Sequence, residues 1–232
     1  MRTEHYIITG TSKGIGMQLA DVLLERGAWV HGISRGTPEP LTAHSQYTHY
    51  AYDLSDHTGI DELMTRILAQ IPAQETEIIG LINNAAMVEP LKPIDQCNAA
   101  EISQSLNISL VAPMILSSAF IRHSNAMNVR RKIVNVSSAS GQYPAPAMGT
   151  YCTAKAGINM FTQCLEAEQG GAENPVDVLT FDPGMVDTEL QAVARGKNEA
   201  EFALSTLFSQ AYEAGQLQDA RDVAERLLAQ LK

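Results

Sequence analysis

The stretch HYIITGTSKGIGMQLADVLLERG, residues 5–27, decides the fold. Its first five residues, HYIIT, are apolar enough for a buried strand, and a glycine-rich turn follows them directly. The apolar residues of the next segment recur at helical spacing: Ile15, Leu19, Val22 and Leu23. Gly27 is a residue type that ends helices. A strand, a glycine turn and a helix in direct succession predict the opening of a βαβ unit.

The rest of the chain repeats this alternation of short apolar runs and helical segments. Further strands are predicted at 29–34 (WVHGIS), 45–52 (SQYTHYAY), 77–83 (EIIGLIN), 132–138 (KIVNVSS) and 176–181 (VDVLTF). The pattern predicts a single α/β domain over residues 1–232, a Rossmann-type doubly wound parallel sheet with strand order 3-2-1-4-5-6. Residues 185–215, amphipathic and interrupted by glycine, are predicted to form a substrate lid.

The composition argues against several classes of partner. The chain carries 16 Lys and Arg against 26 Asp and Glu, a formal net charge of −10, so neither nucleic acid nor an anionic membrane is expected. The N-terminus does not read as a signal peptide, and the apolar run at 110–121 is too short to span a bilayer. Three cysteines and six histidines lack metal-ligand spacing. We expect a cytoplasmic protein without a metal, acting on a small molecule.

The glycine turn predicts a nucleotide site. Gly10, Gly14 and Gly16 differ in spacing from the G-x-G-x-x-G fingerprint, but they permit the same close approach of a pyrophosphate to a helix N-terminus. An ordinary strand-to-helix turn is the alternative. NAD enzymes of this architecture usually carry an acid about twenty residues further on, whereas this chain has Arg35 there. Arg35 and Lys13 favour NADP(H) over two merely solvated surface cations.

The stretch TYCTAKAGINMF, residues 150–161, places Tyr151 and Lys155 one helical turn apart. A free phenol has a pKa of about 10, and a neighbouring ammonium together with an oxidised nicotinamide is expected to lower it. Tyr151 is then a proton donor to a carbonyl oxygen. Ser138, preferred over Ser137, follows the fifth predicted strand and is expected to share that oxygen. The alternatives are a packed tyrosine, a snorkelling lysine and a capping serine.

These motifs occur together in one order: T-G-x-x-x-G-I-G at 9–16, N-N-A at 83–85, Ser138, and Y-x-x-x-K at 151–155. With this set the chain resembles the short-chain dehydrogenase/reductase family over nearly its whole length. The resemblance implies a catalytic set of Asn107, Ser138, Tyr151 and Lys155, with Asn107 holding a water of a proton relay. It also implies that the cofactor contacts Gly10, Ser12, Lys13, Ile15, Arg35, Asp53, Leu54, Asn83, Ala85, Tyr151, Lys155, Pro183, Val186 and Thr188.

Within the family, three runs are similar to the branch of sepiapterin reductases and bacterial benzil reductases: 10–16 (GTSKGIG), 32–36 (GISRG) and 183–191 (PGMVDTELQ). This likeness implies an NADPH-dependent carbonyl reductase that transfers hydride to a ketone or vicinal dicarbonyl. A non-catalytic NADP(H)-binding sensor and an NAD-dependent alcohol dehydrogenase remain alternatives. Substrate-wall positions, which are equally compatible with core packing, are Met87, Val88, Tyr143, Met148 and Met185.

The resemblance has two further consequences. Members of the family usually end with a seventh strand, whereas this chain stops at Lys232 in or just after a helix, so either the sequence is trimmed or the sheet ends at six strands. Members also assemble through two helices, here residues 98–122 and 150–168, so a homodimer or homotetramer is expected.

Overall fold

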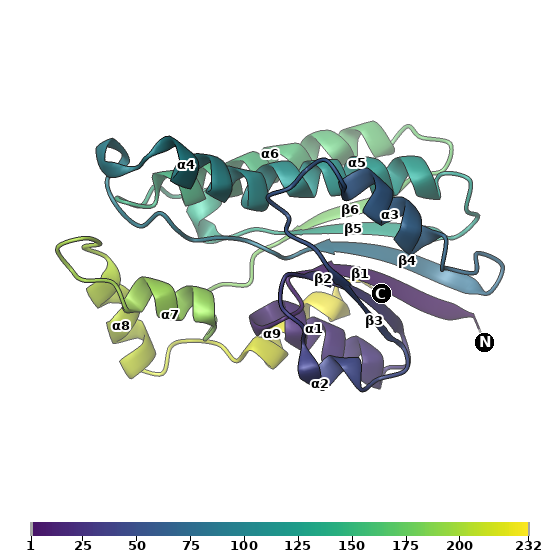
Figure 1. The fold of residues 1–232 in the computed structure, drawn as a ribbon, viewed down its shortest axis with the longest axis horizontal. Coiled ribbons are helices and arrows are strands. Elements are labelled where there is room, and N and C mark those ends of the chain that lie inside the picture. Colours follow the sequence, from purple (N-terminus) through teal and green to yellow (C-terminus); the bar gives the residue numbers. More distant parts are fainter. Residues whose placement is uncertain (1, 232) are drawn as a thin grey trace.

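The computed structural model describes residues 2–231 and contains a six-stranded parallel sheet of order β3-β2-β1-β4-β5-β6 (Figure 1). This confirms the predicted fold class and strand order. The strands are β1 Thr3–Thr9, β2 Trp29–Ser34, β3 Tyr47–Ala51, β4 Thr76–Asn83, β5 Arg130–Val136 and β6 Asp177–Phe181. Within the described residues no seventh strand joins the sheet. The prediction for the fifth strand was two residues too late, so Ser137 and Ser138 lie beyond its end.

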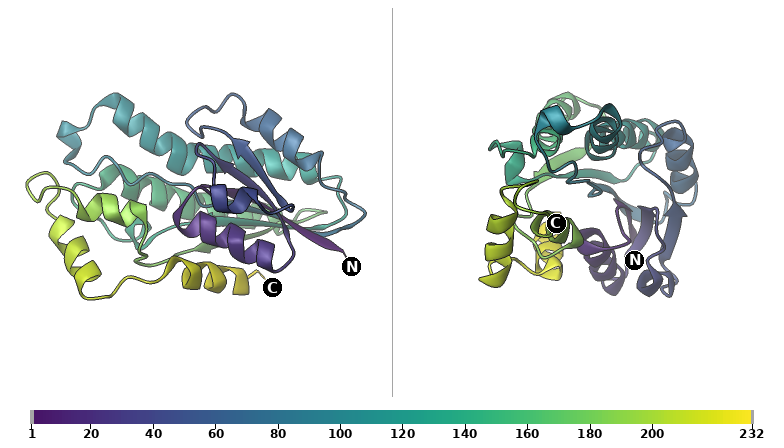
Figure 2. Two further views of the ribbon diagram at one scale, coloured as in Figure 1. Left: turned by 60° about the horizontal axis from the view of Figure 1, so that its bottom comes forward. Right: turned by 60° about the vertical axis from the view of Figure 1, so that its left-hand side comes forward.

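Helices cover both faces of the sheet, as Figures 1 and 2 show. One layer holds α3 Ile60–Leu68, α4 Ala99–Leu106, α5 Ala112–Ser124 and α6 Gly149–Gln169, and the other holds α1 Gly14–Glu25, α2 Glu39–Thr42 and α9 Ala220–Ala229. The apolar stripe of α1 buries Leu19, Val22 and Leu23 against the sheet and α9. Because both faces are covered, the middle of each central strand is buried and mainly apolar, although β5 also buries Arg131, Lys132 and Asn135.

Helices α4 and α5 form one continuous run, Ala99–Ser124, joined by a π-helical turn at Asn107–Val111. By length and composition alone this run of 26 residues would suffice to cross a membrane. It packs on the sheet through Leu116, Ala119 and Phe120, which are fully buried. The core helix of a folded domain passes the same test, so the run carries no membrane assignment.

The segment predicted to be a lid forms two helices, α7 Glu189–Arg195 and α8 Ser205–Glu213 (Figure 1, yellow-green). Gly184 and Gly215 flank it, both with left-handed φ values of 74° and 65°. Gln218 closes its neck, because its N–H donates to Met185 O at 2.9 Å and its carbonyl accepts from Asp187 N at 3.0 Å. The segment is therefore a helical hairpin that leaves the domain and returns to it at one narrow point.

Candidate active site

The glycine turn between β1 and α1 is held in place by the end of β4. Thr9 Oγ1 accepts hydrogen bonds from Asn84 N and Ala85 N, both at 2.9 Å, and the Asn84 amide donates back to Thr9 O at 2.9 Å. A Cβ on Gly16 would lie 2.3 Å from Gly10 O and 2.5 Å from Asn84 Nδ2. The glycines are thus required by this close packing. Thr9 and Asn84 both belong to the sequence motifs, at 9–16 and 83–85, but their spacing in the sequence gave no sign that they bond to each other.

The same turn presents open hydrogen-bond donors. Lys13 stands at the N-cap of α1, and its side chain makes no capping bond. The N–H groups of the first turn of α1 therefore have no side-chain acceptor and can donate to an anion. This arrangement fits the pyrophosphate of a dinucleotide. Three more predicted contacts, Ser12, Ile15 and Gly10, belong to this turn.

The two predicted phosphate-binding cations differ in their surroundings. Lys13 forms an ion pair with Glu189, the first residue of α7, so its charge is already shared with the lid. Arg35 is exposed and makes no ion pair with any other residue of the described chain. Arg35 lies close enough to Asp53 to contribute to the lowered pKa of that carboxyl, which is held down mainly by the N–H and hydroxyl of Ser55. Arg35 is therefore the available cation near the Asp53–Leu54 segment.

The side chain of Asn83 is hydrogen-bonded inside the chain. Its side-chain amide donates to Asn135 Oδ1 at 2.8 Å and to Ser117 Oγ at 3.2 Å, inside the helix layer. Asn135 in turn donates to Thr162 at 2.9 Å. The Asn83 side chain thus joins β4 to β5 and α5 in a buried polar network. Only its backbone and the adjacent Ala85 remain to border a cofactor.

Tyr151 and Lys155 lie together on the first two turns of α6. Both are buried, with 7% and 3% of their surface exposed. The Lys155 ammonium donates to Val136 O at 2.7 Å, at the end of β5, and lies 5.6 Å from the centre of the Tyr151 ring. The spacing of four residues therefore does bring the phenol and the ammonium onto one buried helical face at the end of the central strands.

The environment shifts the pKa of each group. Burial raises the pKa of Tyr151 to about 12, hydrogen bonding with the Ser138 side chain opposes this rise, and the charge of Asp182 adds to it. Burial lowers the pKa of Lys155 to about 8, against the effect of Asp182. The chain's own groups thus keep the phenol protonated near neutral pH. We expected Lys155 together with an oxidised nicotinamide to lower the pKa of Tyr151. The groups of the chain alone do not lower it.

Ser137 and Ser138 have different partners. Ser137 is buried and donates to Asn159 Oδ1 at 2.5 Å, so it stabilises the contact between β5 and α6. Ser138 is the N-cap of the short 3₁₀ turn Ala139–Gly141 and accepts from Ser140 N at 3.2 Å. Its hydroxyl still carries a proton to donate, next to Tyr151. This geometry supports the choice of Ser138.

Asn107 begins the π turn of the long helix rather than sitting in a regular helix. Its carbonyl accepts the N–H of Ala112, five residues on, which widens the turn. Turns of this kind often mark functional sites in helices. The sequence motif located Asn107 but gave no sign of the π turn.

The lid hairpin, α7 and α8 with their connection, packs against the apolar cluster that contains Tyr151. Val88, Leu91 and Met148 surround Tyr151 in one apolar cluster, to which the lid adds Ala194 and Phe202. Lys197 of the lid pairs with Glu89 at 2.8 Å. Of the predicted wall positions, Val88 and Met148 are in this cluster, Met87 lines a neighbouring cavity of about 370 Å³, and Tyr143 and Met185 are exposed.

The three predicted contacts after β6 have structural partners at the lid neck. Val186 is buried and bridges to Gln218, and Pro183 O accepts from Arg226 at 2.7 Å. Thr188 caps α7 by accepting from Gln191 N, and it lies over the glycine turn, 3.4 Å from where a Cβ on Gly14 would be. The neck therefore joins the lid to the predicted cofactor site.

Among the described residues no cluster of three His, Cys, Asp or Glu side chains suits a metal.

Residues 4–199 match the family model described as short chain dehydrogenase. The chain belongs to the short-chain dehydrogenase/reductase family and is an oxidoreductase by that membership. Over 229 residues it is 37% identical to a benzil reductase ((S)-benzoin forming) of Bacillus cereus, covering 97% of this chain and 92% of that protein. It is 28% identical to a sepiapterin reductase of Bos taurus, covering 97% and 88%. These relatives confirm the expected branch.

Solved structures show the same fold. A 4-hydroxyisoleucine dehydrogenase complexed with NADH superposes with a TM-score of 0.83 at 21% identity, covering 99% of this chain and 91% of that one. The family binds a nicotinamide cofactor, and the glycine turn of this chain fits one.

Proposed function

We propose that the chain is an NADPH-dependent carbonyl reductase that reduces a ketone or a vicinal dicarbonyl of the benzil or sepiapterin kind. The observation that carries this proposal is the buried, protonated Tyr151 beside Lys155 and Ser138. The similarity to a benzil reductase supports an aryl diketone as substrate. The apolar cluster around Tyr151 offers matching surface for an aromatic ring.

Each catalytic residue has a defined task in this reaction. When bound, the nicotinamide supplies the hydride to the carbonyl carbon. Tyr151 gives its phenolic proton to the carbonyl oxygen, and the Ser138 hydroxyl donates a hydrogen bond to the same oxygen as negative charge builds on it. The Lys155 ammonium stabilises the phenolate that is left. Asn107, at the π turn, holds a water of the proton relay through which the phenolate regains its proton. The lid excludes water from this exchange.

The preference for NADPH rests on Arg35, which, unlike Lys13, has no ion-pair partner among residues 2–231. Replacing Arg35 by Ser should raise the KM for NADPH about 10- to 100-fold, because a charge-assisted phosphate contact is lost. The KM for NADH, which lacks the 2′-phosphate, should change little. Steady-state kinetics with both cofactors measure this. An equal rise in KM for NADPH and for NADH would show that Arg35 does not bind the 2′-phosphate. Efficient turnover of the wild type with NADH would favour the alternative function, an NAD-dependent alcohol dehydrogenase.

Lys155 should set the alkaline limit of activity. Its pKa is about 8, so the ammonium is present below that pH and is lost above it. The kcat for ketone reduction should therefore be highest below pH 8 and decline as pH rises through it, while Tyr151 stays protonated. A pH profile of kcat from roughly pH 6 to pH 10 tests this. A kcat that keeps rising above pH 8 would contradict the assigned role of Lys155.

The overall function is tested by following NADPH consumption with benzil, a sepiapterin-like diketone and a wider carbonyl panel. Turnover of a diketone with NADPH is expected. If NADPH binds and every carbonyl compound is inert, the non-catalytic sensor becomes the better interpretation.

We further propose that the protein works in the cytoplasm as a homodimer or homotetramer. The outward faces of α5 and α6 expose Met114 and Met160, apolar side chains that a helix-to-helix interface would bury. Light scattering should give a mass of two or four chains. A purely monomeric enzyme would contradict the assembly.

A further inference from the structure

Two side chains of α6 hold the end of β5 just before the catalytic serine. Tyr151, Lys155 and Asn159 follow one another at intervals of four residues, so they lie on one face of the helix. The Lys155 ammonium donates to Val136 O at 2.7 Å. One turn further along, Asn159 Oδ1 accepts the hydroxyl of Ser137 at 2.5 Å. The strand end is thus fixed to the helix at two consecutive residues.

The turn that follows the strand also packs against Asn159. Ser138 is the N-cap of this turn, whose last residue is Gly141. A Cβ on Gly141 would lie 2.6 Å from Asn159 Nδ2 and 2.8 Å from both C and O of Lys155. The backbone of the turn therefore lies directly on α6, with no room for a side chain between them. Asn159 contacts the chain on both sides of Ser138.

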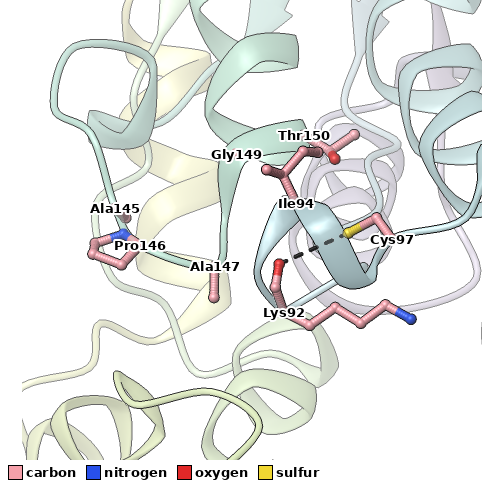
Figure 3. A pocket seen from close by; sticks show the side chains of 8 residues that line it. All are labelled: Lys92, Ile94, Cys97, Ala145, Pro146, Ala147, Gly149 and Thr150. Atoms are coloured by element: carbon pink, nitrogen blue, oxygen red, sulfur yellow. Dashed lines mark hydrogen bonds between the residues drawn. The ribbon is translucent and has the colours of Figure 1, made fainter.

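The loop beyond the turn offers less support. The side chains of residues 142–144 and of Pro146 are exposed. Figure 3 shows Ala145, Pro146 and Ala147 beside Gly149 at the start of α6, where they line a pocket of about 240 Å³. A loop with this much exposed surface constrains its neighbours less than packed structure does. The position of the turn therefore depends on its contacts with α6.

Asn159 is too far from Tyr151 to touch the reacting carbonyl group. The two residues are eight positions apart on α6, which corresponds to about 12 Å along the helix axis. Any effect of Asn159 on the reaction must pass through the residues that it holds. Of these, Ser138 stands next to Tyr151.

We propose that Asn159 is a positioning residue, which holds both sides of the turn so that the Ser138 hydroxyl stays aimed at the substrate oxygen. The proposal rests on the proposed function, in which Ser138 donates a hydrogen bond to that oxygen. Such a donor is effective only when its geometry is fixed before the reaction. The bond from Ser137 and the close contact at Gly141 supply this fixed geometry.

The kinetic test is a double-mutant cycle with a diketone and NADPH. Asn159→Ala should lower kcat about tenfold, a part of the 10²–10³-fold that complete loss of such a donor costs, and should leave the KM for NADPH unchanged. Ser137→Ala, which removes the donor to Asn159, should have a similar effect. In a Ser138→Ala background, Asn159→Ala should change kcat by less than about twofold, because no hydroxyl is left to position. Gln163→Ala, exposed on the next turn of α6, is the matched control.

Hydrogen exchange tests the structural part without turnover. The N–H groups of Gly141 and Gln142 donate to Ser138 O and Ala139 O, both at 2.9 Å, so they report on the order of the turn. In full-length Asn159→Ala these amides should exchange faster than in the wild type. The amides of α1 should keep their wild-type rates, which separates a local change from a general loss of stability.

Two results would overturn the proposal. One is wild-type exchange in the turn of Asn159→Ala, which would show that other contacts hold it. The other is a loss of kcat that is equally large with and without the Ser138 hydroxyl, which would show that Asn159 does not act through Ser138. A wild type that reduces no carbonyl compound would overturn the proposed function and the catalytic part of this proposal with it. Hydrogen exchange would still decide whether Asn159 holds the turn.

Discussion

The Tyr151→Phe variant should lose carbonyl reduction almost completely, with kcat lower by about 10²–10⁴-fold, the range that a positioned proton donor contributes. Tyr151 is buried beside the Lys155 ammonium and the Ser138 hydroxyl, and its environment keeps the phenol protonated. Phenylalanine keeps the ring and its packing against Val88 and Met148, so the fold and NADPH affinity should remain. The measurement is kcat with a diketone, beside a direct titration with NADPH.

The matched control is Tyr6→Phe, which removes a phenol hydroxyl from another buried tyrosine. Tyr6 lies in β1 and donates to Glu4 at 3.0 Å, away from the ends of the strands where Tyr151 lies. The kcat of Tyr6→Phe should stay within about threefold of the wild type, because the hydrogen bond to Glu4 does not involve Tyr151, Lys155 or Ser138. A Tyr151→Phe enzyme that retains more than a tenth of wild-type kcat would remove the tyrosine from the mechanism.

The Gly16→Ala variant should lose NADPH affinity by tenfold or more and be less stable by about 1–3 kcal/mol, the usual cost of overpacking. The new Cβ would lie 2.3 Å from Gly10 O and 2.9 Å from Gly10 C. These are backbone atoms of the turn itself, so relief requires the phosphate-binding loop to move. Urea unfolding and NADPH titration measure the two effects.

Gly171→Ala is the matched control, since nothing lies within 4 Å of a Cβ there and its φ is not left-handed. Its stability and NADPH affinity should match those of the wild type. If Gly16→Ala bound NADPH as the wild type does, the close packing of the glycine turn would not matter for the cofactor.

Local patterns were sufficient to predict most of the fold. The strand–glycine–helix stretch at residues 5–27 and its repetition predicted six strands in the observed order, because each strand and helix buries a regular apolar face. The boundaries were less accurate. The fifth strand ends at Val136 rather than Ser138. Ser137 N still donates to Phe181 O of β6 at 2.8 Å, and the chain leaves the sheet at Ser138, which caps the turn Ala139–Gly141.

What the sequence did not predict depends on contacts between distant segments. Lys13 was expected to be free for a phosphate, but its partner Glu189 is 176 residues away, and no local pattern links them. The motif that contains Asn83 gave no sign that its side-chain amide donates to Asn135, 52 residues away, in the core. The packing of Thr9 with Asn84 likewise spans 75 residues. The proximity of Tyr151 and Lys155 was predictable because both stand on one helix, four residues apart.

Hydride transfer from NADPH to a carbonyl carbon can be followed with an isotope label. The wild-type protein would be incubated with benzil and NADPH carrying deuterium at one of the two C4 positions of the nicotinamide, and the product analysed by mass spectrometry. We expect benzoin with one deuterium on the carbinol carbon from one of the two labelled cofactors, and almost no benzoin with Tyr151→Phe. NADPH that binds without benzoin being formed, or benzoin that carries no label from either cofactor, would contradict it.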